Sequence, residues 1–418
     1  MKRLYRYLPP LAGDYSGVCS ALYELGGMLC IHDASGCTGN YTGFDEPRSY
    51  GSSSLVYCTA LRRNDAVMGN EEVYIQKIIR AAEEMKPRFI GLVGSPVPLV
   101  IGFDFNGVAR EIEARTGIPT FGFATSGMQG CYKDGVAMAL NKLLDYYVPA
   151  DMNKEKCEAQ KDSNRNREGR CVNIVGATPL DISEENLAAF QELLYERGYE
   201  VVCTLAMGET LENIPNCVGA DVNLAISQAG LITAMNMYEK YNIPYLAGLP
   251  IGEKGCEHYF RCLDMVFEEG KNLEVSMVPV DVDEEHMKDV DGVAEERRAV
   301  ILEDGILASS IKVELLAQGY TRVDIVSLFG KDRGVSTIDM EFPDGEREIL
   351  QAVNRADYQL VVADPILLQC RQDKSDVTLL EMPKYSVSSK LMHKRRWTYI
   401  GDAWNRKLEQ AENILLNV

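Results

Sequence analysis

A cysteine flanked by glycines carries the strongest chemical signal in the chain. Cys37 directly follows Gly36, Gly39 comes two residues later, and the apolar run 26–31 precedes the segment. This pattern predicts a strand that runs into a tight loop presenting one sulfur, where Gly36 lets the backbone approach a bulky ligand. A thiolate held there suits a soft metal centre such as an iron–sulfur cluster. The alternative is a small buried thiol, because unpaired cysteine is among the most buried residue types.

The other cysteines narrow the kind of site. The chain has 12 cysteines but no Cys-x-x-Cys, which argues against a zinc ribbon or a bacterial ferredoxin pattern. No apolar h-region follows the basic N-terminal residues, so we expect no secretory signal and reduced thiols. Cys58, after the small-residue run 52–54, is the second candidate metal ligand; ordinary packing is its alternative.

Charge and missing motifs exclude several classes of function. The 43 basic and 62 acidic residues give a net charge of −19, which argues against a nucleic-acid partner or an anionic membrane surface. The chain has no run of about 18 apolar residues, so no membrane-spanning helix is predicted. The chain also has no P-loop of its own, and it lacks a Gly-x-Gly-x-x-Gly fingerprint after its leading strands, so a dinucleotide is not indicated. These observations fit a cytoplasmic enzyme.

The elements that must position Cys37 alternate between strands and helices. Helical spacing over 71–85 is followed by buried strands at 89–94 and 118–123, and this alternation predicts a parallel sheet. The pattern recurs twice more, and 418 residues exceed what one core usually supports. We therefore expect an α/β fold of three Rossmann-like parallel-sheet units in tandem. The predicted boundaries are a first domain at 1–150, a polar linker at 151–170, and further domains at 171–280 and 281–418, the last closed by a helix at 404–416.

Four segments in order resemble the component 1 subunits of nitrogenase and nitrogenase-like reductases. The family's His-Gly-x-x-Gly-Cys loop is echoed by residues 32–37, and its Val-Phe-Gly-Gly segment by residues 64–71. Residues 93–104 are similar to its Ser/Thr-Thr-Cys-Pro strand end and the Val-Ile-Gly-Asp-Asp stretch after it. Residues 124–130 loosely match a Thr-Pro-x-Phe-x-Gly-Ser loop. The resemblance by motif covers residues 8–150, and the remainder is similar by architecture.

The departures from the family pattern matter as much as the matches. Where cluster-rich members carry three N-terminal cysteines, the first position falls at residues 10–12 without a cysteine and the third is Ser95. The family's cofactor-ligating cysteine would fall near Ser227 and Gln228, so nitrogen fixation is not expected. In dark-operative protochlorophyllide reductase relatives, one subunit supplies three cysteines and the other a single ligand from the loop that corresponds to Cys37. This chain resembles the second kind of subunit.

Further residues are weaker candidates, each with a structural alternative. His32 is a candidate hydrogen-bond donor to a cluster sulfide, or a partly buried loop histidine. Ser95 is a candidate oxygen ligand, or a loop cap. Gln228 and His258 are candidates for lining a substrate pocket between domains. The basic segment 394–397 either binds an anionic group or docks a partner, with a solvated surface as the alternative.

The resemblance implies a subunit of a two-component reductase. A separate ATP-dependent iron protein would deliver low-potential electrons to a 4Fe–4S cluster, and from there to a small-molecule substrate. The cluster would lie at an interface with a homologous component 1 subunit or with a second copy of this chain. The alternative function is a cluster-free scaffold or cofactor-assembly subunit that kept the fold.

Overall fold

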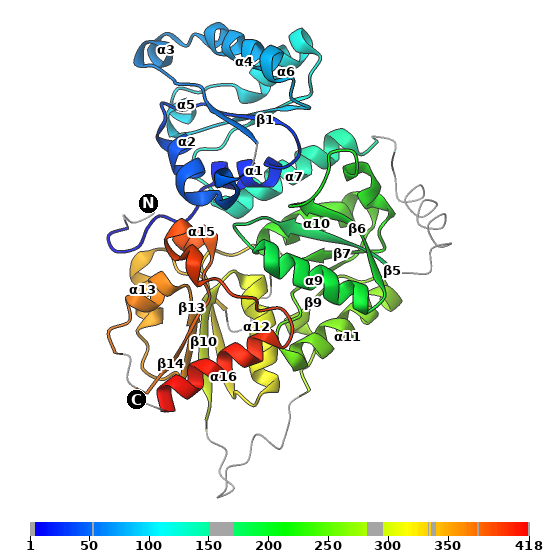
Figure 1. The fold of residues 1–418 in the computed structure, drawn as a ribbon, viewed down its shortest axis with the longest axis vertical. Coiled ribbons are helices and arrows are strands. Elements are labelled where there is room, and N and C mark those ends of the chain that lie inside the picture. The colour runs from blue at the N-terminus through cyan, green and yellow to red at the C-terminus, as the bar shows by residue number, and fades with distance from the viewer. Residues whose placement is uncertain are drawn as a thin grey trace, which may run out of the picture.

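The computed structural model shows three α/β units, each built on one parallel sheet (Figure 1). This architecture confirms the expected fold class of three Rossmann-like units in tandem. The first unit is drawn in blue to cyan, the second in green, and the third in yellow to red. The structure describes residues 5–51, 54–149, 152, 170–281, 296–332, 334–335, 340–373 and 376–416.

The first sheet is covered on both faces, and its strand order is β2-β1-β3-β4. Successive side chains of β1 alternate between the two faces, as the pleat requires. Leu29 and Ile31 pack with helices α1 and α7, whereas Met28 and Cys30 pack with α4 and α6. The elements are α1 (Asp14–Leu22), β1 (Met28–Ile31), β2 (Leu55–Cys58), α4 (Glu71–Met85), β3 (Ile90–Val93), α6 (Phe105–Thr116), β4 (Thr120–Phe123) and α7 (Tyr132–Tyr147).

The second sheet has the order β6-β5-β7-β8-β9, and the third has the order β12-β11-β10-β13-β14. The second unit contains β5 (Arg170–Ala177), α9 (Glu184–Glu196), β6 (Tyr199–Ala206), β7 (Val222–Ala225), α10 (Gln228–Tyr241), β8 (Tyr245–Ala247), α11 (Glu253–Glu269) and β9 (Leu273–Glu274). The third contains β10 (Arg298–Glu303), α12 (Gly305–Ala317), β11 (Arg322–Ser327), β12 (Met340–Glu341), α13 (Glu346–Val353), β13 (Leu360–Ala363), α14 (Pro365–Gln369), β14 (Thr378–Glu381), α15 (Tyr385–Ser388) and α16 (Ala403–Leu416).

Every strand pairing in these sheets is parallel, so the chain crosses back after each strand. In each sheet the strand order reverses direction beside the first strand of the unit. In open parallel sheets, ligands bind beyond the carboxyl ends of the strands at such a point. This topology directs attention to the segments that follow β1, β5 and β10.

The sequence-based element boundaries differ from the structure in a few places. The strand β2 and the helix α1 were not expected, and the expected loop at 95–98 overlaps the short helix α5 (Pro96–Val100). Apart from Arg170, the first residue of β5, which ends the predicted linker, the strands of each sheet fall inside one of the three predicted domain ranges, and the boundaries themselves stay predictions. Most of the expected linker 151–170 lies outside the described residues. Within the described part of the chain, no helix is long and apolar enough to cross a bilayer.

Two glycines let α1 and α7 cross at backbone contact. A Cβ at Gly17 would lie 1.9 Å from the carbonyl oxygen of Tyr132, and a Cβ at Gly135 would lie 1.8 Å from that of Asp14. No side chain fits at such distances, so the helices must separate to accept one. The crossing therefore fixes how α1 and α7 pack against one face of the first sheet.

We predict that Gly17→Ala lowers the free energy of unfolding by about 1–3 kcal/mol, the usual range for overpacking a tight core. Gly39→Ala is the control, because a Cβ at Gly39 meets nothing within 4 Å. Urea unfolding of the two iron-free variants measures the difference. Equal midpoints for both variants would contradict the close crossing.

Candidate functional site

Cys37 and Cys58 come to the same edge of the first sheet. Cys58 is the last residue of β2 and pairs with Ile31, the last residue of β1. Cys37 lies in the first turn of the short helix α2 (Gly36–Asn40), which follows β1, rather than in the expected open loop. Because β1 and β2 are parallel, their carboxyl ends place both thiols at one edge.

Asp33 holds the two cysteine segments together. Its side-chain Oδ2 accepts hydrogen bonds from the backbone N–H groups of Ser35 at 3.0 Å and Thr38 at 3.1 Å, which caps α2. Its backbone carbonyl accepts from the Cys58 thiol at 3.3 Å and from the N–H of Leu61 at 2.8 Å. One residue therefore positions the loop after β1 against the loop after β2.

The surroundings of Cys37 favour the neutral thiol in the isolated chain. Burial is the largest cause that raises the pKa of Cys37 to about 11, and the negative charges of Asp33 and Asp14 and the neighbouring Cys58 thiol contribute to that value. A thiol binds metal as the thiolate, so binding at Cys37 requires proton release. A Cβ at Gly36 or Gly39 meets nothing within 4 Å, so within this chain the space above the loop is open.

His32 lies at the same edge, and its ring packs on the opposite face of the sheet, among aromatic rings. Its ring centroid is 4.3 Å from that of Tyr74 and 4.6 Å from that of Phe103. Its Nδ1 lies 2.7 Å from the Thr59 hydroxyl. Burial lowers the pKa of His32 to about 4, and the nearby Lys77 ammonium adds to this effect. The structure gives His32 a packing role and does not bring its ring to Cys37.

Ser95 and Gln228 are both engaged in hydrogen bonds within the chain. The buried Ser95 hydroxyl donates to the His32 carbonyl at 2.7 Å, which ties the loop after β3 to the loop after β1. The Gln228 amide donates to Asp332 Oδ2 at 2.7 Å and to the Gly330 carbonyl at 3.0 Å. Its oxygen accepts from the Gly305 N–H at 3.0 Å. Gln228 thus joins the second unit to the third and is not near Cys37 in the hydrogen-bond network.

Six of the exposed apolar side chains of the first unit lie on the segments that follow its strands. Helix α3 (Arg63–Met68) follows β2, α5 follows β3, and Figure 1 shows both on the same side of the unit as α2. We call these side chains the apolar rim: Val67, Met68, Val97, Val100, Ile101 and Met128. Val67 and Met68 are each 78% exposed and Val100 is 83% exposed. Exposed apolar side chains that gather on one side of a domain are typical of an interaction surface.

A buried charge network at the junction of the three units was missed by sequence reasoning. The Lys384 ammonium lies 2.9 Å from Glu303 and 3.8 Å from Asp181, and all three side chains are nearly inaccessible. The hydroxyl of Tyr132, at the start of α7, donates to Asp181 Oδ1 at 2.5 Å. Asp181 therefore takes part in this network rather than capping α9, whose N-cap is Ser183. The sequence does hold one signal for buried charge in this region. Asp304 and Asp364 each directly follow a buried strand, and Asp304 is one of the acids that act on Lys384.

Burial dominates the titration behaviour of this network. It raises the pKa of Asp181 to about 7, against the opposing effect of Lys384, and it raises the pKa of Glu303 as well. Burial lowers the pKa of Lys384, but the charges of Glu303, Asp304 and Asp181 outweigh it, so the pKa is raised. Lys384 therefore stays charged at neutral pH inside the junction.

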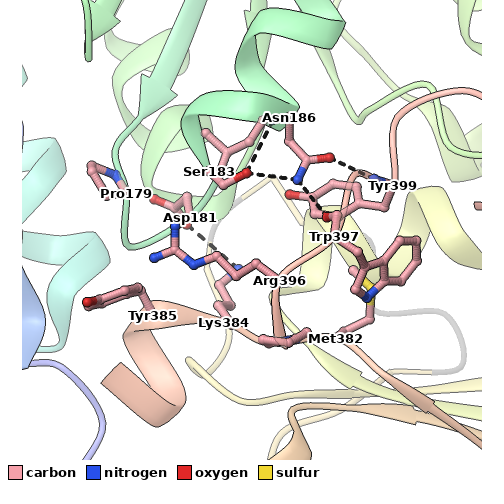
Figure 2. Close-up of a pocket in the computed structure, with 12 residues that line it drawn as sticks. Pro179, Asp181, Ser183, Asn186, Met382, Lys384, Tyr385, Arg396, Trp397 and Tyr399 are labelled. Atoms are coloured by element: carbon pink, nitrogen blue, oxygen red, sulfur yellow. Dashed lines mark hydrogen bonds and ion pairs between the residues drawn. The ribbon is translucent and has the colours of Figure 1, made fainter. Parts of the chain in front are cut away.

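A small cavity opens beside this network, between the second and third units (Figure 2). Its volume of about 20 Å³ holds a water molecule. Its walls come from the segment after β5 and from residues 382–399 of the third unit. Asp181 and Lys384 line it, together with Arg396 from the basic segment 394–397. His258, the other pocket candidate, instead lies 2.8 Å from the Val275 carbonyl and does not line it.

The family model of the nitrogenase component 1 type oxidoreductases matches residues 14–358. The chain is 23% identical over 254 residues to the nitrogenase molybdenum-iron protein alpha chain of Methanosarcina barkeri, covering 57% of this chain and 44% of that protein. It is 24% identical over 226 residues to one of the light-independent protochlorophyllide reductase subunits of Crocosphaera subtropica, covering 52% and 43%. The aligned parts are thus less than half of these relatives.

Two further comparisons extend this picture. The chain is 26% identical over 243 residues to the nitrogenase iron-molybdenum cofactor biosynthesis protein NifE of Rhodobacter capsulatus, covering 56% of this chain and 47% of that protein. The solved structure "Nitrogenase Cp1 at pH 5" superposes with a TM-score of 0.67 at 17% identity, covering 100% of this chain and 90% of that chain. The structural superposition supports the fold alone, and the match to the family model supports the family.

We predict that His32 remains neutral down to about pH 4. The unfolded chain binds a proton near pH 6.5, so His32 favours folding fully above that pH and progressively less as the pH falls toward 4. When the pH falls from 6.5 to 4, the free energy of unfolding of the unmodified chain should decrease by on the order of 3 kcal/mol more than that of His32→Gln. Urea unfolding at both pH values measures it, with exposed His393→Gln as the control. A ring titration midpoint near 6.5 would refute the prediction.

We predict that Lys384→Met destabilises the chain by about 3–5 kcal/mol, because it leaves Glu303 and Asp181 buried without their cation. The double variant Lys384→Met, Glu303→Leu should recover part of that loss. The surface pair of Lys271 and Glu269 gives the matched control, and Lys271→Met should change stability by less than about 1 kcal/mol. Thermal and urea unfolding measure these effects; similar losses at both lysines would contradict the assignment.

Proposed function

The chain belongs to the nitrogenase component 1 type oxidoreductase family, and on that premise we propose that it is an electron-transfer subunit of a nitrogenase-like reductase. It would pass electrons from an ATP-dependent iron protein, through an iron–sulfur cluster at a subunit interface, to a small-molecule substrate. The observation that carries the proposal is the placement of two thiols, Cys37 and Cys58, at one sheet edge in the unit that bears the apolar rim.

The residues present fit one side of such a cluster. Cys37 and Cys58 supply soft ligands, and the open space above Gly36 and Gly39 leaves room beside them. Among the described residues, no group of three or more Cys, His, Asp or Glu is placed to hold a metal ion. Two ligands from this chain leave a four-iron cluster incomplete, so the remaining ligands belong to a partner subunit.

The apolar rim supports a partner at this edge. A second component 1 subunit seated on it would bury the side chains of Val67, Met68 and Val100 and exclude water from the thiols. Cys19 and Cys30, the other N-terminal cysteines, are 0% and 1% exposed, which removes them from the set of ligands that this chain offers. A second copy of the chain would add another Cys37 and Cys58. A homologous three-cysteine subunit would need Cys37 alone.

The roles of the chain's own residues follow from this arrangement. Cys37 and Cys58 would bind the cluster, which when present stores and passes single electrons. Asp33 would position both thiols through its carboxylate and carbonyl contacts. The buried His32 would stay neutral and add no charge at the edge, since its pKa is lowered by burial. Release of the Cys37 proton would accompany cluster binding.

The same chain is not proposed to hold a catalytic nitrogenase-type cofactor. Gln228, near the position where the family's cofactor-ligating cysteine would fall, uses both its amide nitrogen and its oxygen in the contact between the second and third units. Displacing it would take a hydrogen-bond partner from the backbone of Gly305 and from the carboxylate of Asp332. This supports electron transfer rather than nitrogen reduction.

A cofactor-assembly scaffold is the second candidate. The observation that favours it is Ser95, which stands where the third cysteine of cluster-rich members falls and whose hydroxyl donates to the His32 carbonyl. A scaffold that kept the fold would need neither a third ligand nor a redox-active cluster. The two functions differ in whether a reducible cluster depends on Cys37.

We predict that anaerobically prepared protein, alone or with a homologous partner subunit, contains iron and acid-labile sulfide and gives a paramagnetic signal after dithionite reduction. Cys37→Ala should abolish the signal, because it removes a thiolate ligand. Cys58→Ala should abolish it in a homodimer and leave it in place in a heterodimer with a three-cysteine subunit, which needs Cys37 alone. Cys370→Ala, another partly exposed thiol but in the third unit, is the matched control and should retain it.

Folded protein without iron under every condition would remove the electron-transfer proposal and leave the scaffold. A signal that survives Cys37→Ala would show that the cluster is held elsewhere. Circular dichroism of each variant confirms that loss of iron does not reflect loss of fold.

A further inference from the structure

The junction of the three units buries more acids than cations. Four carboxylates are buried there: Asp181, Glu303, Asp304 and Asp364. Among the described residues, the cation in contact with this set is Lys384, whose ammonium lies 2.9 Å from Glu303 and 3.8 Å from Asp181. One lysine leaves a net negative charge if all four acids are ionised. Such a charge is costly away from water, and a proton bound to one acid relieves it.

Three of the four acids are held by groups that favour the ionised form. Asp304 accepts hydrogen bonds from three backbone N–H groups, and Asp364 accepts from two. Glu303 contacts the Lys384 ammonium directly. Hydrogen bonds from N–H groups and a contacting cation both stabilise a carboxylate over the neutral acid. A proton is therefore better placed on the fourth acid, Asp181.

The partners of Asp181 suit the neutral acid as well as the carboxylate. The described residues that donate to its oxygens are the hydroxyls of Tyr132 at 2.5 Å and Thr178 at 3.2 Å. A hydroxyl can also accept a hydrogen bond, so Thr178 can receive the proton of the neutral acid. The Lys384 ammonium lies farther from Asp181 than from Glu303. Asp181 can thus gain or lose a proton without losing its partners.

The other titratable groups around Asp181 supply no free cation. Lys133, next to Tyr132 on α7, pairs with Asp332 at 2.6 Å. Burial keeps Tyr399 neutral by raising its pKa. Arg396 lines the same cavity as Asp181, but it is only partly buried and two acids of the first turn of α9 act on it. These acids are Glu184 and Glu185.

The cavity of Figure 2 brings water to this carboxyl group. Asp181 lines the cavity, whose volume of about 20 Å³ has room for one water molecule. A water molecule in that position can carry a proton to or from Asp181. The acid can therefore titrate in the folded chain.

The direction of the resulting pH dependence follows from linkage. Burial raises the pKa of Asp181 from 3.8 to about 7, and the charge of Asp304 adds to the shift, whereas Lys384 opposes it. Burial also raises the pKa of Asp364, to about 6, so Asp181 binds a proton first as the pH falls. The bound proton stabilises the closed junction fully below about pH 3.8, and this stabilisation is lost as the pH rises to about 7.

We propose that Asp181 is a proton-controlled switch at the junction of the three units. With the proton bound, the junction stays closed; without it, repulsion from Asp304 and the hydration of the free carboxylate favour opening. The first unit meets the other two here through Tyr132, so the placement of the unit that bears Cys37 and Cys58 becomes dependent on pH. The switch goes beyond the proposed electron transfer and does not require a cluster.

The test uses hydrogen–deuterium exchange of the full-length, iron-free chain between about pH 6 and about pH 8. The amides of residues 181–182 and 386–388 report on opening, because they are hydrogen-bonded in the closed junction. Dividing each exchange rate by the intrinsic rate of an unstructured peptide at the same pH gives the opening equilibrium.

We expect this equilibrium to rise by at least about tenfold from about pH 6 to about pH 8, as a pKa of about 7 in the closed junction and 3.8 in water requires. Asp181→Asn should reduce the rise to about twofold or less, the part that Asp364 contributes. Glu184→Gln, which removes an exposed acid three residues away, is the matched control and should keep the full rise.

Tyr132→Phe gives a second readout and carries the test if Asp181→Asn does not fold. The Tyr132 hydroxyl lowers the pKa of Asp181 by its hydrogen bond, so its removal should move the opening transition to higher pH. A merely structural contact would loosen the junction equally at every pH.

Three results would overturn the proposal. The first is an opening equilibrium of the unmodified chain that does not change with pH. The second is a rise that Asp181→Asn leaves intact or that Glu184→Gln abolishes equally. The third is a transition whose midpoint stays in place in Tyr132→Phe.

Discussion

The parallel pairing of β1 with β2 and β3 is the constraint on which the candidate site depends. It places the segments after Ile31, Cys58 and Val93 at one edge, although these residues are far apart in the sequence. Asp33 and Ser95 then tie these segments to one another through hydrogen bonds. Two thiols thereby become neighbours without any local motif that joins them. A shift of β2 by one residue would turn the Cys58 side chain to the other face of the sheet.

The junction of the three units is held by charge rather than by apolar packing alone. Lys384 contacts acids of the second and third units, and Asp181 accepts from Tyr132 of the first. Buried ion pairs add little net stability compared with apolar substitutes, but removing one partner is costly. Such a network therefore specifies how the units fit together. Asn186 adds to this junction, because it donates to the Trp397 carbonyl and accepts from the Tyr399 N–H, which fastens the third unit to the second beside the cavity.

The sequence predicts much of the fold because its signals are local. Buried strands ended by glycine or acid and helices ended by αL residues such as Gly117 and Asn242 repeat three times, and their alternation gives parallel sheets. The sequence does not reveal β2, because an apolar run of four residues, Leu55–Cys58, is too short to distinguish a strand from other buried segments. It identifies Cys37 from its glycines, but it cannot show that Asp33 joins Cys37 to Cys58. The roles of Lys384 and Asp181 depend on contacts between units, which no spacing in the sequence reveals.

Electrostatics link the two cysteines to assembly. In the single chain, burial and two nearby carboxylates, Asp33 and Asp14, oppose ionisation of Cys37 by raising its pKa. A cluster on the proposed interface reverses this balance, because metal cations stabilise the thiolate more than the carboxylates destabilise it. The ionised site is then favoured only where metal and partner are both present, and the apolar rim is covered in the same event. On the proposed function, the cost of the buried acids keeps the lone subunit from holding metal at an exposed edge, and ligation becomes cooperative with dimer formation.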